Sequence, residues 1–408
     1  MDKLTTSNKA LEFILNNSQN YGTEEVPFSH SLGRVLKENI VADRDFPPFN
    51  RVSMDGIAIQ FSEFENGKRT FKVEGIQPAG SKPHSMQNHE NCIEVMTGAV
   101  LPKNTDVVIP YEQVSIVDGI ATIEIKELRF FQNIHEQGKD KKEGDLIIPQ
   151  NKVISSAEIG VLATVGKWTV KVAKQPKVMI VSTGDELVEV NETPADYQIR
   201  RSNVHTLVSI LKKYYIDADS AHIADDKNAL KEKIENFLND YDVLLFSGAV
   251  SKGKFDFIPE ILEELRVEKL FHKVAQRPGK PFWFGHKIIG SSRNNRNDKI
   301  VFAFPGNPIS TFVSCLKYFV PWYQKSMKLD FENRTFALLG EDVIFKPSLT
   351  YFLQVKLEKR NGDLVAVPIR GNGSGDLAIL VEADAFIELP NDRVEFKKDE
   401  VFPIIEYR

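Results

Sequence analysis

Apolar residues recur along the chain at spacings that change from one stretch to the next. In residues 7–17 they fall on one stripe of a helix, and Thr6 or Ser7 precedes that stripe as a candidate N-cap. This spacing predicts an amphipathic helix whose apolar stripe packs against another part of the chain.

Residues 57–148 show a different pattern, with short β-branched runs separated by glycine, proline and asparagine. The clearest runs are 92–95, 107–109 and 120–125. Ser155 and Glu158 then form a capping-box signature ahead of an apolar run, which predicts that a helix resumes there. We therefore expect a small all-β unit inserted between two helical segments.

From Lys177 onward, apolar strands alternate with amphipathic helices. The predicted strands are 178–182, 243–247 and 300–304, and the predicted helices are 202–215, 226–240, 256–265 and 309–323. Such alternation indicates a mostly parallel sheet with helices on both faces. Ligands of these sheets bind beyond the carboxyl ends of the strands, so the loops after Ser182, Ser247 and Phe304 form the expected site.

Beyond Met327 the helical pattern gives way to short strand patterns again. Turns are expected at Asn361–Gly362 and at 371–375. A second β-rich region is therefore predicted for the last part of the chain.

The composition is that of a globular protein, with 42% hydrophobic and 27% charged residues. A net charge of -5 argues against sequence-independent binding to nucleic acid or an anionic membrane, so any anionic ligand must be held locally. Cys92 and Cys315 lie far apart and indicate neither a disulfide framework nor a zinc site, which fits a reducing cytoplasm. We expect no signal peptide and no membrane-spanning segment.

The first candidate loop is residues 247–257, SGAVSKGKFDF, which follows a strand and precedes a helix. Backbone N–H groups are exposed at the amino end of a helix, so Ser247, Gly248, Ser251 and Lys252 are candidate anion-binding residues. The segment matches neither the P-loop nor the G-x-G-x-x-G pattern. A plain tight turn is an equally good interpretation of its glycines and serines.

Two further segments favour an anionic ligand. Lys273, Arg277 and Lys280 lie in a stretch without an acidic residue, and on a regular strand the first two would share one face. Solvated surface charges are the alternative. Two prolines, Pro305 and Pro308, stiffen the turn at 305–308. The start of a helix at this turn would explain Pro308 but not Pro305. The residues of the turn are Pro305, Gly306, Asn307 and Pro308.

Isolated acidic residues also occur in the predicted loops. They are Asp55, Asp140, Asp185, Glu186, Asp225, Asp226 and Asp256. Carboxylates beside an anion site commonly hold Mg²⁺, because this ion prefers oxygen ligands. For Asp185 and Asp226 a turn or a helix cap is the simpler interpretation.

Six segments in order along the chain resemble the molybdopterin molybdenumtransferases, a family that includes the carboxy-terminal domain of gephyrin. The segments are PPFNRVSMDGIAI (47–59), EVMTGAVLP (94–102), STGDEL (182–187), SGAVSKGKFDF (247–257), RPGKPFWFG (277–285) and PGNPIS (305–310). The resemblance implies Mg²⁺-dependent insertion of molybdate into adenylylated molybdopterin with release of AMP. That reaction is the last step of molybdenum cofactor synthesis.

The resemblance also implies an elongated cytoplasmic homodimer whose α/β subunits have four parts. The expected parts are a discontinuous linker domain (1–45 and 142–174), an inserted β-rich domain (46–141), a doubly wound sheet domain (175–326) and a β-barrel-like domain (327–408). Each site is expected where the sheet domain of one subunit faces the inserted and terminal domains of the other. Molybdopterin adenylyltransferase and molybdoenzymes are the expected partners.

Residue by residue, the resemblance assigns acids, basic residues and loops to the site. The implied catalytic residues are Asp55, Thr97, Asp140, Glu186, Asp225 and Asp256, of which the last three would hold Mg²⁺. The implied substrate-binding residues are Ser247, Gly248, Ser251, Lys252, Lys273, Arg277, Lys280, Pro305, Gly306, Asn307, Pro308 and Ser374. The sequence departs from many relatives at Ala249, where a second glycine is common, and from some relatives at Arg277, where lysine occurs.

Two other functions stay open at this point. A molybdopterin adenylyltransferase would share the sheet domain, but the SMDG and MTGA segments argue against it. A non-catalytic scaffold, as in gephyrin, is the second alternative. The acids at Asp55, Glu186 and Asp256 favour an enzyme.

Overall fold

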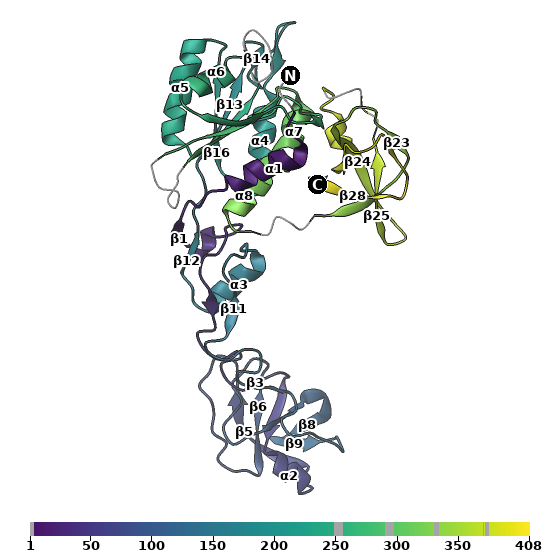
Figure 1. Cartoon of the computed structure of the whole chain (residues 1–408). Coiled ribbons are helices and arrows are strands. Elements are labelled where there is room, and N and C mark those ends of the chain that lie inside the picture. The colour runs from purple at the N-terminus through teal and green to yellow at the C-terminus, as the bar shows by residue number, and fades with distance from the viewer. Residues whose placement is uncertain (1–3, 249–255, 290–297, 330–333, 370, 372–374) are drawn as a thin grey trace.

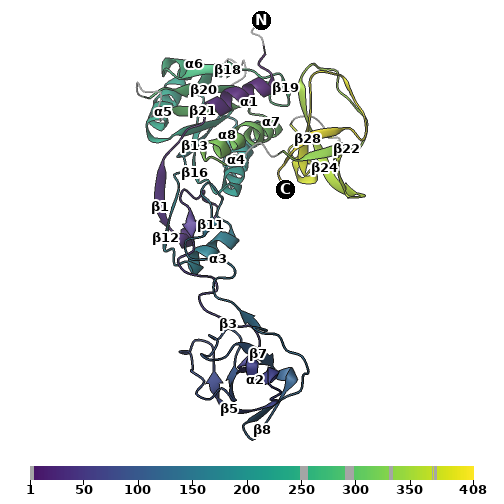
Figure 2. The same ribbon diagram turned by 60° about the horizontal axis from the view of Figure 1, so that its bottom comes forward.

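The computed structural model describes residues 4–248, 256–289, 298–329, 334–369, 371 and 375–408. The chain is elongated, with a sheet flanked by helices and a small barrel at one end and a separate β-sheet at the other (Figure 1). Two narrow strand pairs and a helix lie between these ends, and the second view shows the same order (Figure 2). No helix in the described ranges is long and apolar enough to span a membrane.

The predicted amino-terminal helix is confirmed as α1 (Ser7–Asn16). The side chain of Thr6 caps it by accepting a hydrogen bond from the Lys9 N–H. Its buried stripe, Ala10, Leu11 and Ile14, joins the apolar core on one face of the large sheet. The helix is thus held by tertiary packing, far along the chain from the strands that it covers.

The large sheet is mostly parallel, as predicted. Its order is β16-β13-β17-β21-β20-β18, in which the first four strands pair in parallel and the β21–β20 and β20–β18 pairings are antiparallel. The strands are β13 (Val178–Thr183), β16 (Ala218–Ile223), β17 (Val243–Ser247), β18 (Glu268–His272), β20 (Trp283–Lys287) and β21 (Lys299–Phe304). Four parallel strands therefore end at one edge of the sheet.

Helices cover both faces of this sheet, because successive residues of a strand point in opposite directions. Ile180 of β13 faces a core shared with α1 and α4, whereas Val181 faces a core shared with α5 and α6. The helices are α4 (Ser202–Lys213), α5 (Lys227–Asp240) and α6 (Ile258–Glu264). The doubly wound arrangement predicted from the sequence is confirmed.

The helix predicted for 309–323 is present but is not one regular α-helix. It runs as α7 (Pro308–Ser314), a π-helical turn η3 (Cys315–Phe319) and α8 (Val320–Ser326). The wide turn contains Lys317, whose Nζ lies 2.6 Å from Oε2 of Glu388. Glu388 belongs to the terminal β region, so this turn joins the two parts of the structure.

The terminal β region is a closed barrel. Its strands follow the order β24-β25-β22-β28-β26, and β26 pairs back onto β24. These strands are β22 (Phe336–Leu339), β24 (Thr350–Arg360), β25 (Asp363–Pro368), β26 (Ala385–Leu389) and β28 (Val401–Glu406), with the smaller β23 (Val343–Ile344), β27 (Glu395–Phe396) and α9 (Ile379–Glu382) beside them. Asn361 and Gly362 have φ of 53° and 94° and make the predicted turn between β24 and β25.

Two strand pairs connect segments before and after the far β-sheet. Strand β1 (Thr23–Pro27) pairs with β12 (Thr169–Ala173), and β2 (Ile40–Val41) pairs with β11 (Leu146–Ile148). The far sheet has the order β7-β4-β6-β5-β9-β8. Its strands are β4 (Gly56–Ile59), β5 (Thr70–Gln77), β6 (Asn91–Val95), β7 (Val107–Pro110), β8 (Val114–Val117) and β9 (Ile120–Ile123), accompanied by α2 (Phe61–Glu65), β3 (Arg51–Val52) and β10 (Ile134–His135). The β-branched runs predicted as strands are therefore confirmed.

The capping box predicted at Ser155 is present at the start of α3 (Ser156–Thr164). Ser155 N–H donates to Glu158 Oε2 at 2.8 Å, and the Lys152 ammonium lies 3.2 Å from the same carboxylate. These contacts, led by the Ser155 hydroxyl, lower the pKa of Glu158 from 4.5 to about 2. Because folding lowers this pKa, the stabilisation is present above pH 4.5 and is lost as the pH falls toward 2.

We expect Glu158→Gln to lower the free energy of unfolding by about 2 kcal/mol at pH 7. Because glutamine keeps the capping hydrogen bond, the loss of stability reports the contribution of the negative charge alone. Chemical denaturation of both proteins at several pH values measures the difference, which should shrink between pH 5 and pH 2. An equal difference at pH 7 and pH 3 would contradict the role of the charge.

Candidate active site

The loops that follow the parallel strands converge on a cavity of about 320 Å³. Thr183 and Glu186 come from the end of β13, Ser247 and Gly248 from the end of β17, and Pro305 with Gly306 and Pro308 from the turn after β21. The convergence of these three loops was predicted from the alternation of strands and helices. It follows from the parallel arrangement, which brings all carboxyl ends to one edge.

Asn203, which was not predicted, holds two of these loops together. Its side-chain amide donates hydrogen bonds to Ser247 Oγ at 2.9 Å and to the carbonyl oxygen of Gly306 at 2.8 Å. Gly248 has a φ of 108°. A Cβ atom added to Gly306 would lie 3.6 Å from the Cα of Gly248. The two turns thus touch through their backbones. The sequence did offer one sign of Asn203: it is a polar residue in the first turn of the predicted helix that follows Arg201.

The turn at 305–308 starts helix α7, as one interpretation of the sequence held. Asn307 is the N-cap and accepts a hydrogen bond from Ser310 N–H at 3.1 Å, and Pro308 is the first helical residue. The carbonyl of Pro305 accepts from the Thr311 hydroxyl, which explains why that proline is fixed as well. The start of a helix at this turn is confirmed. The turn also lines the cavity, and its binding of a substrate stays a prediction.

Glu186, Asp225 and Asp256 all line the cavity. Partial burial raises the pKa of Asp225, and the nearby carboxylates of Asp185, Glu186 and Asp256 raise it further. Mutual repulsion of this kind is relieved by a divalent cation, and all donors are oxygens, as Mg²⁺ prefers. The residues therefore supply the oxygen donors and the negative charge that the metal implied by the family resemblance needs, although their ligand atoms do not all lie within 4.8 Å of one another.

Asp185 and Asp226 have the local roles that were the simpler interpretation. Asp185 Oδ1 accepts from the Asp225 N–H at 3.1 Å, and Asp226 Oδ1 caps α5 by accepting from the Ala229 N–H at 2.7 Å. Within the described ranges, the only three acids or histidines whose ligand atoms lie within 4.8 Å of one another are in the far sheet, not in this cavity. Those residues are Glu63, His89 and Glu90.

The basic segment does not form the regular strand that was expected, so that prediction was wrong. Strand β18 ends at His272, and Lys273 has φ of 76° and donates its N–H to the Phe282 carbonyl, which turns the chain. Arg277 lies instead in β19 (Gln276–Arg277), which pairs with β24 of the barrel. Lys273, Arg277 and Lys280 are not among the residues that line the cavity at the sheet edge.

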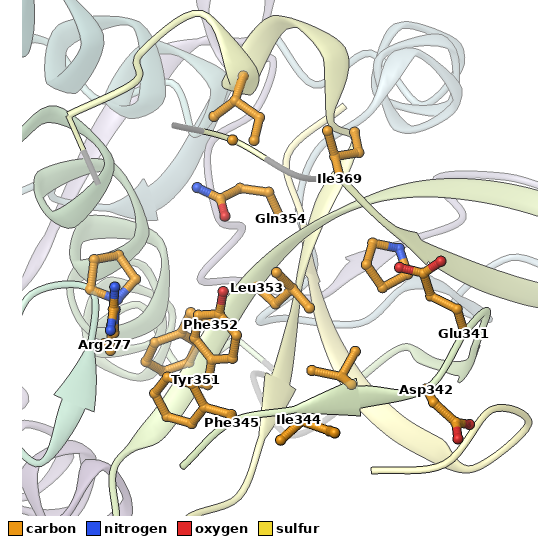
Figure 3. A pocket seen from close by; sticks show the side chains of 15 residues that line it. Arg277, Glu341, Asp342, Ile344, Phe345, Tyr351, Phe352, Leu353, Gln354 and Ile369 are labelled. Atoms are coloured by element: carbon orange, nitrogen blue, oxygen red, sulfur yellow. The ribbon is translucent and has the colours of Figure 1, made fainter. Parts of the chain in front are cut away.

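Arg277 lines a second cavity, of about 540 Å³, whose other lining residues, apart from Pro278, belong to the barrel region. Figure 3 shows it beside the aromatic rings of Phe345 and Tyr351, with Glu341 and Asp342 across the cavity. Its guanidinium carbon lies 6.0 Å from the centre of the Phe345 ring, and the Phe345 and Tyr351 rings stack at 4.2 Å. The cation thus faces a cavity with aromatic walls and an acidic edge.

The predicted residues of the inserted region lie together at the opposite end of the chain. Asp55 Oδ1 accepts from both the N–H and the hydroxyl of Thr97, at 2.6 and 2.7 Å, and the N–H contact lowers the pKa of Asp55 most. Asp140 lies 2.9 Å from His135 Nε2. Asp55 and Thr97 lie beside strands β4 and β6 of the far β-sheet, which is at the opposite end of the molecule from β13 (Figure 1). His135 was not predicted from the sequence.

Three predicted site residues fall outside the described ranges. They are Ser251, Lys252 and Ser374.

The sheet that carries the acid-lined cavity defines a class of protein. Residues 179–325 match the family described as a probable molybdopterin binding domain. The flanking regions match the MoeA N-terminal region, domains I and II (residues 5–166), and the MoeA C-terminal region, domain IV (residues 337–407).

Whole-length relatives agree with these matches. The chain is 38% identical over 397 residues to the molybdopterin molybdenumtransferase of Synechocystis, covering 97% of each chain. It is 30% identical over 387 residues to that of Staphylococcus epidermidis, covering 93% of this chain and 90% of the relative. A solved MoeA protein from Pyrococcus horikoshii matches at a TM-score of 0.80 and 30% identity over all of both chains. The chain belongs to the MoeA family of molybdopterin molybdenumtransferases.

Proposed function

We propose that the protein inserts molybdate into adenylylated molybdopterin and releases AMP, yielding the molybdenum cofactor. The observation that carries the proposal is the convergence of three strand-ending loops on a cavity with three acids, in a chain that matches its named relatives over nearly their whole length. A backbone-lined cavity at a sheet edge suits a phosphorylated ligand.

In this proposal Glu186, Asp225 and Asp256 hold Mg²⁺, which when bound neutralises charge on the phosphate oxygens. The loop from Ser247 and the 305–308 turn orient the substrate. The chain supplies positioning and charge stabilisation and needs no nucleophile of its own. Arg277 and its basic neighbours bind an anionic part of the substrate beside the barrel.

We further propose that the active form is a cytoplasmic homodimer with the four-part division predicted from the sequence. Asp55, Thr97 and Asp140 belong to the part of the chain around the far β-sheet, which lies at the opposite end of the molecule from β13 (Figure 1). This arrangement supports a site completed by a second subunit. Ser251, Lys252 and Ser374 remain proposed substrate-binding residues. Molybdopterin adenylyltransferase, as donor of the substrate, and molybdoenzymes, as acceptors of the product, remain proposed partners.

The test supplies adenylylated molybdopterin, molybdate and Mg²⁺ and measures AMP by chromatography. We expect AMP release to depend on molybdate and to stop when EDTA removes Mg²⁺. An adenylyltransferase would instead consume ATP with molybdopterin, and a scaffold would release nothing. Release of AMP that continues in excess EDTA would contradict the assignment of the three acids to a metal.

A further inference from the structure

Two buried polar side-chain atoms in the sheet-edge cavity lack a hydrogen-bond partner within the described part of the chain. Arg201 is 8% exposed and Thr183 is 5% exposed, and both line the cavity. The unpartnered atoms are Arg201 Nε and Thr183 Oγ1. Buried polar groups in native proteins are nearly always paired, so an unpaired guanidinium N–H in a cavity points to a ligand.

The amino end of helix α4 adds backbone donors at the same place. Arg201 is the N-cap residue of this twelve-residue helix, and its side chain makes no capping hydrogen bond. Ser202, Asn203 and Val204, the first turn of the helix, all line the cavity. The first N–H groups of a helix have no partner within it, and the helix dipole favours a negative charge there.

The charges around the cavity indicate what Arg201 binds. Its Nη1 lies 3.2 Å from Glu189, whose side chain is 52% exposed, so the pair is open to solvent and weak. The neighbouring Arg200 is exposed and donates its Nε to the Glu192 carbonyl. Because Lys273, Arg277 and Lys280 lie outside this cavity, Arg201 is the buried cation on its described wall.

We propose that Arg201, Thr183 and the amino end of α4 form a subsite for a tetrahedral oxyanion. The fork of a guanidinium group matches two oxygens of such an anion, and the hydroxyl and helix N–H groups supply further donors. The subsite accepts either a phosphoryl group of the nucleotide part of the substrate or molybdate itself. It rests on the proposed function, in which this cavity holds the phosphorylated substrate that receives molybdate.

The test titrates the full-length protein with AMP and, separately, with sodium molybdate, using calorimetry. Arg201→Gln should weaken binding of the anion that occupies the subsite by about 10- to 100-fold, and Thr183→Val by about 3- to 10-fold. Arg201→Lys keeps the charge but not the fork and should fall between wild type and Arg201→Gln. The matched control Lys212→Gln removes one charge from the last turn of the same helix, outside the cavity, and should change binding by less than about 2-fold.

Comparison of the AMP and molybdate titrations shows which anion the subsite binds. A loss confined to AMP assigns the subsite to the phosphoryl group, and a loss confined to molybdate assigns it to the metal oxyanion. Unchanged binding of both by a folded Arg201→Gln protein, or no binding of either by wild type, overturns the proposal. If Arg201→Gln loses binding but wild type releases no AMP from adenylylated molybdopterin, the subsite stands and the proposed function fails.

Discussion

Asp256→Ala is expected to reduce AMP release by at least about 10³-fold while leaving the fold intact. Asp256 shares the cavity with Glu186 and Asp225, and its charge contributes to the raised pKa of Asp225. Removing it takes away one of the three carboxylates proposed to hold Mg²⁺, and with it the charge stabilisation at the phosphate. The measurement is the rate of AMP release at saturating substrate and Mg²⁺.

Asp226→Asn is the matched control for this prediction. Asp226 lies next to Asp225 but caps α5, and asparagine caps a helix as well as aspartate does. This variant should therefore keep its turnover. Thermal unfolding of both variants checks the fold, and full turnover by a folded Asp256→Ala protein would show that Asp256 holds no catalytic metal.

Breaking the ion pair between Lys317 and Glu388 is expected to destabilise the protein by about 3–5 kcal/mol. The two side chains are 5% and 11% exposed, and their charged atoms lie 2.6 Å apart. Burial lowers the pKa of Lys317, and the Glu388 carboxylate opposes that shift. Glu388→Ala leaves the ammonium group buried without its partner, between the π-helical turn and strand β26 of the barrel.

A double variant separates the effect of losing the ion pair from the effect of leaving one buried charge without its partner. Lys317→Met with Glu388→Leu removes both charges and should recover most of the lost stability, since apolar residues of similar size replace buried ion pairs well. The exposed pair of Lys397 and Asp342 is the matched control, and Asp342→Asn should cost less than about 1 kcal/mol. Calorimetric unfolding measures the stability of the Glu388→Ala variant, the double variant and the Asp342→Asn variant. A Glu388→Ala protein as stable as wild type would refute the prediction.

Glu388 of this pair belongs to the same barrel that lines the second cavity. Arg277 lines that cavity from strand β19, and the pair joins strand β26 of the barrel to the π-helical turn η3.

The sequence by itself determined the features that depend on neighbours in the chain. The helical stripe of 7–17 and the capping box at Ser155 are local patterns that predicted their helices correctly. The alternation from Lys177 onward predicted the doubly wound sheet and its strands β13, β17 and β21, but not β16, β18 and β20. The convergence of the loops after Ser182, Ser247 and Phe304 also followed, because parallel strands end at one edge whatever their order. The ordered segments identified the family.

Only the tertiary structure decided which side chains meet across long stretches of sequence. Asn203 bridges two loops, Lys317 pairs with Glu388, and Arg277 turns away to the barrel because the chain reverses at Lys273. No local period encodes such contacts, since they depend on how distant elements pack. The state of Arg201 Nε is also decided by the tertiary structure. Its burial, and the lack of a hydrogen-bond partner for it among the described residues, depend on how the cavity folds around it.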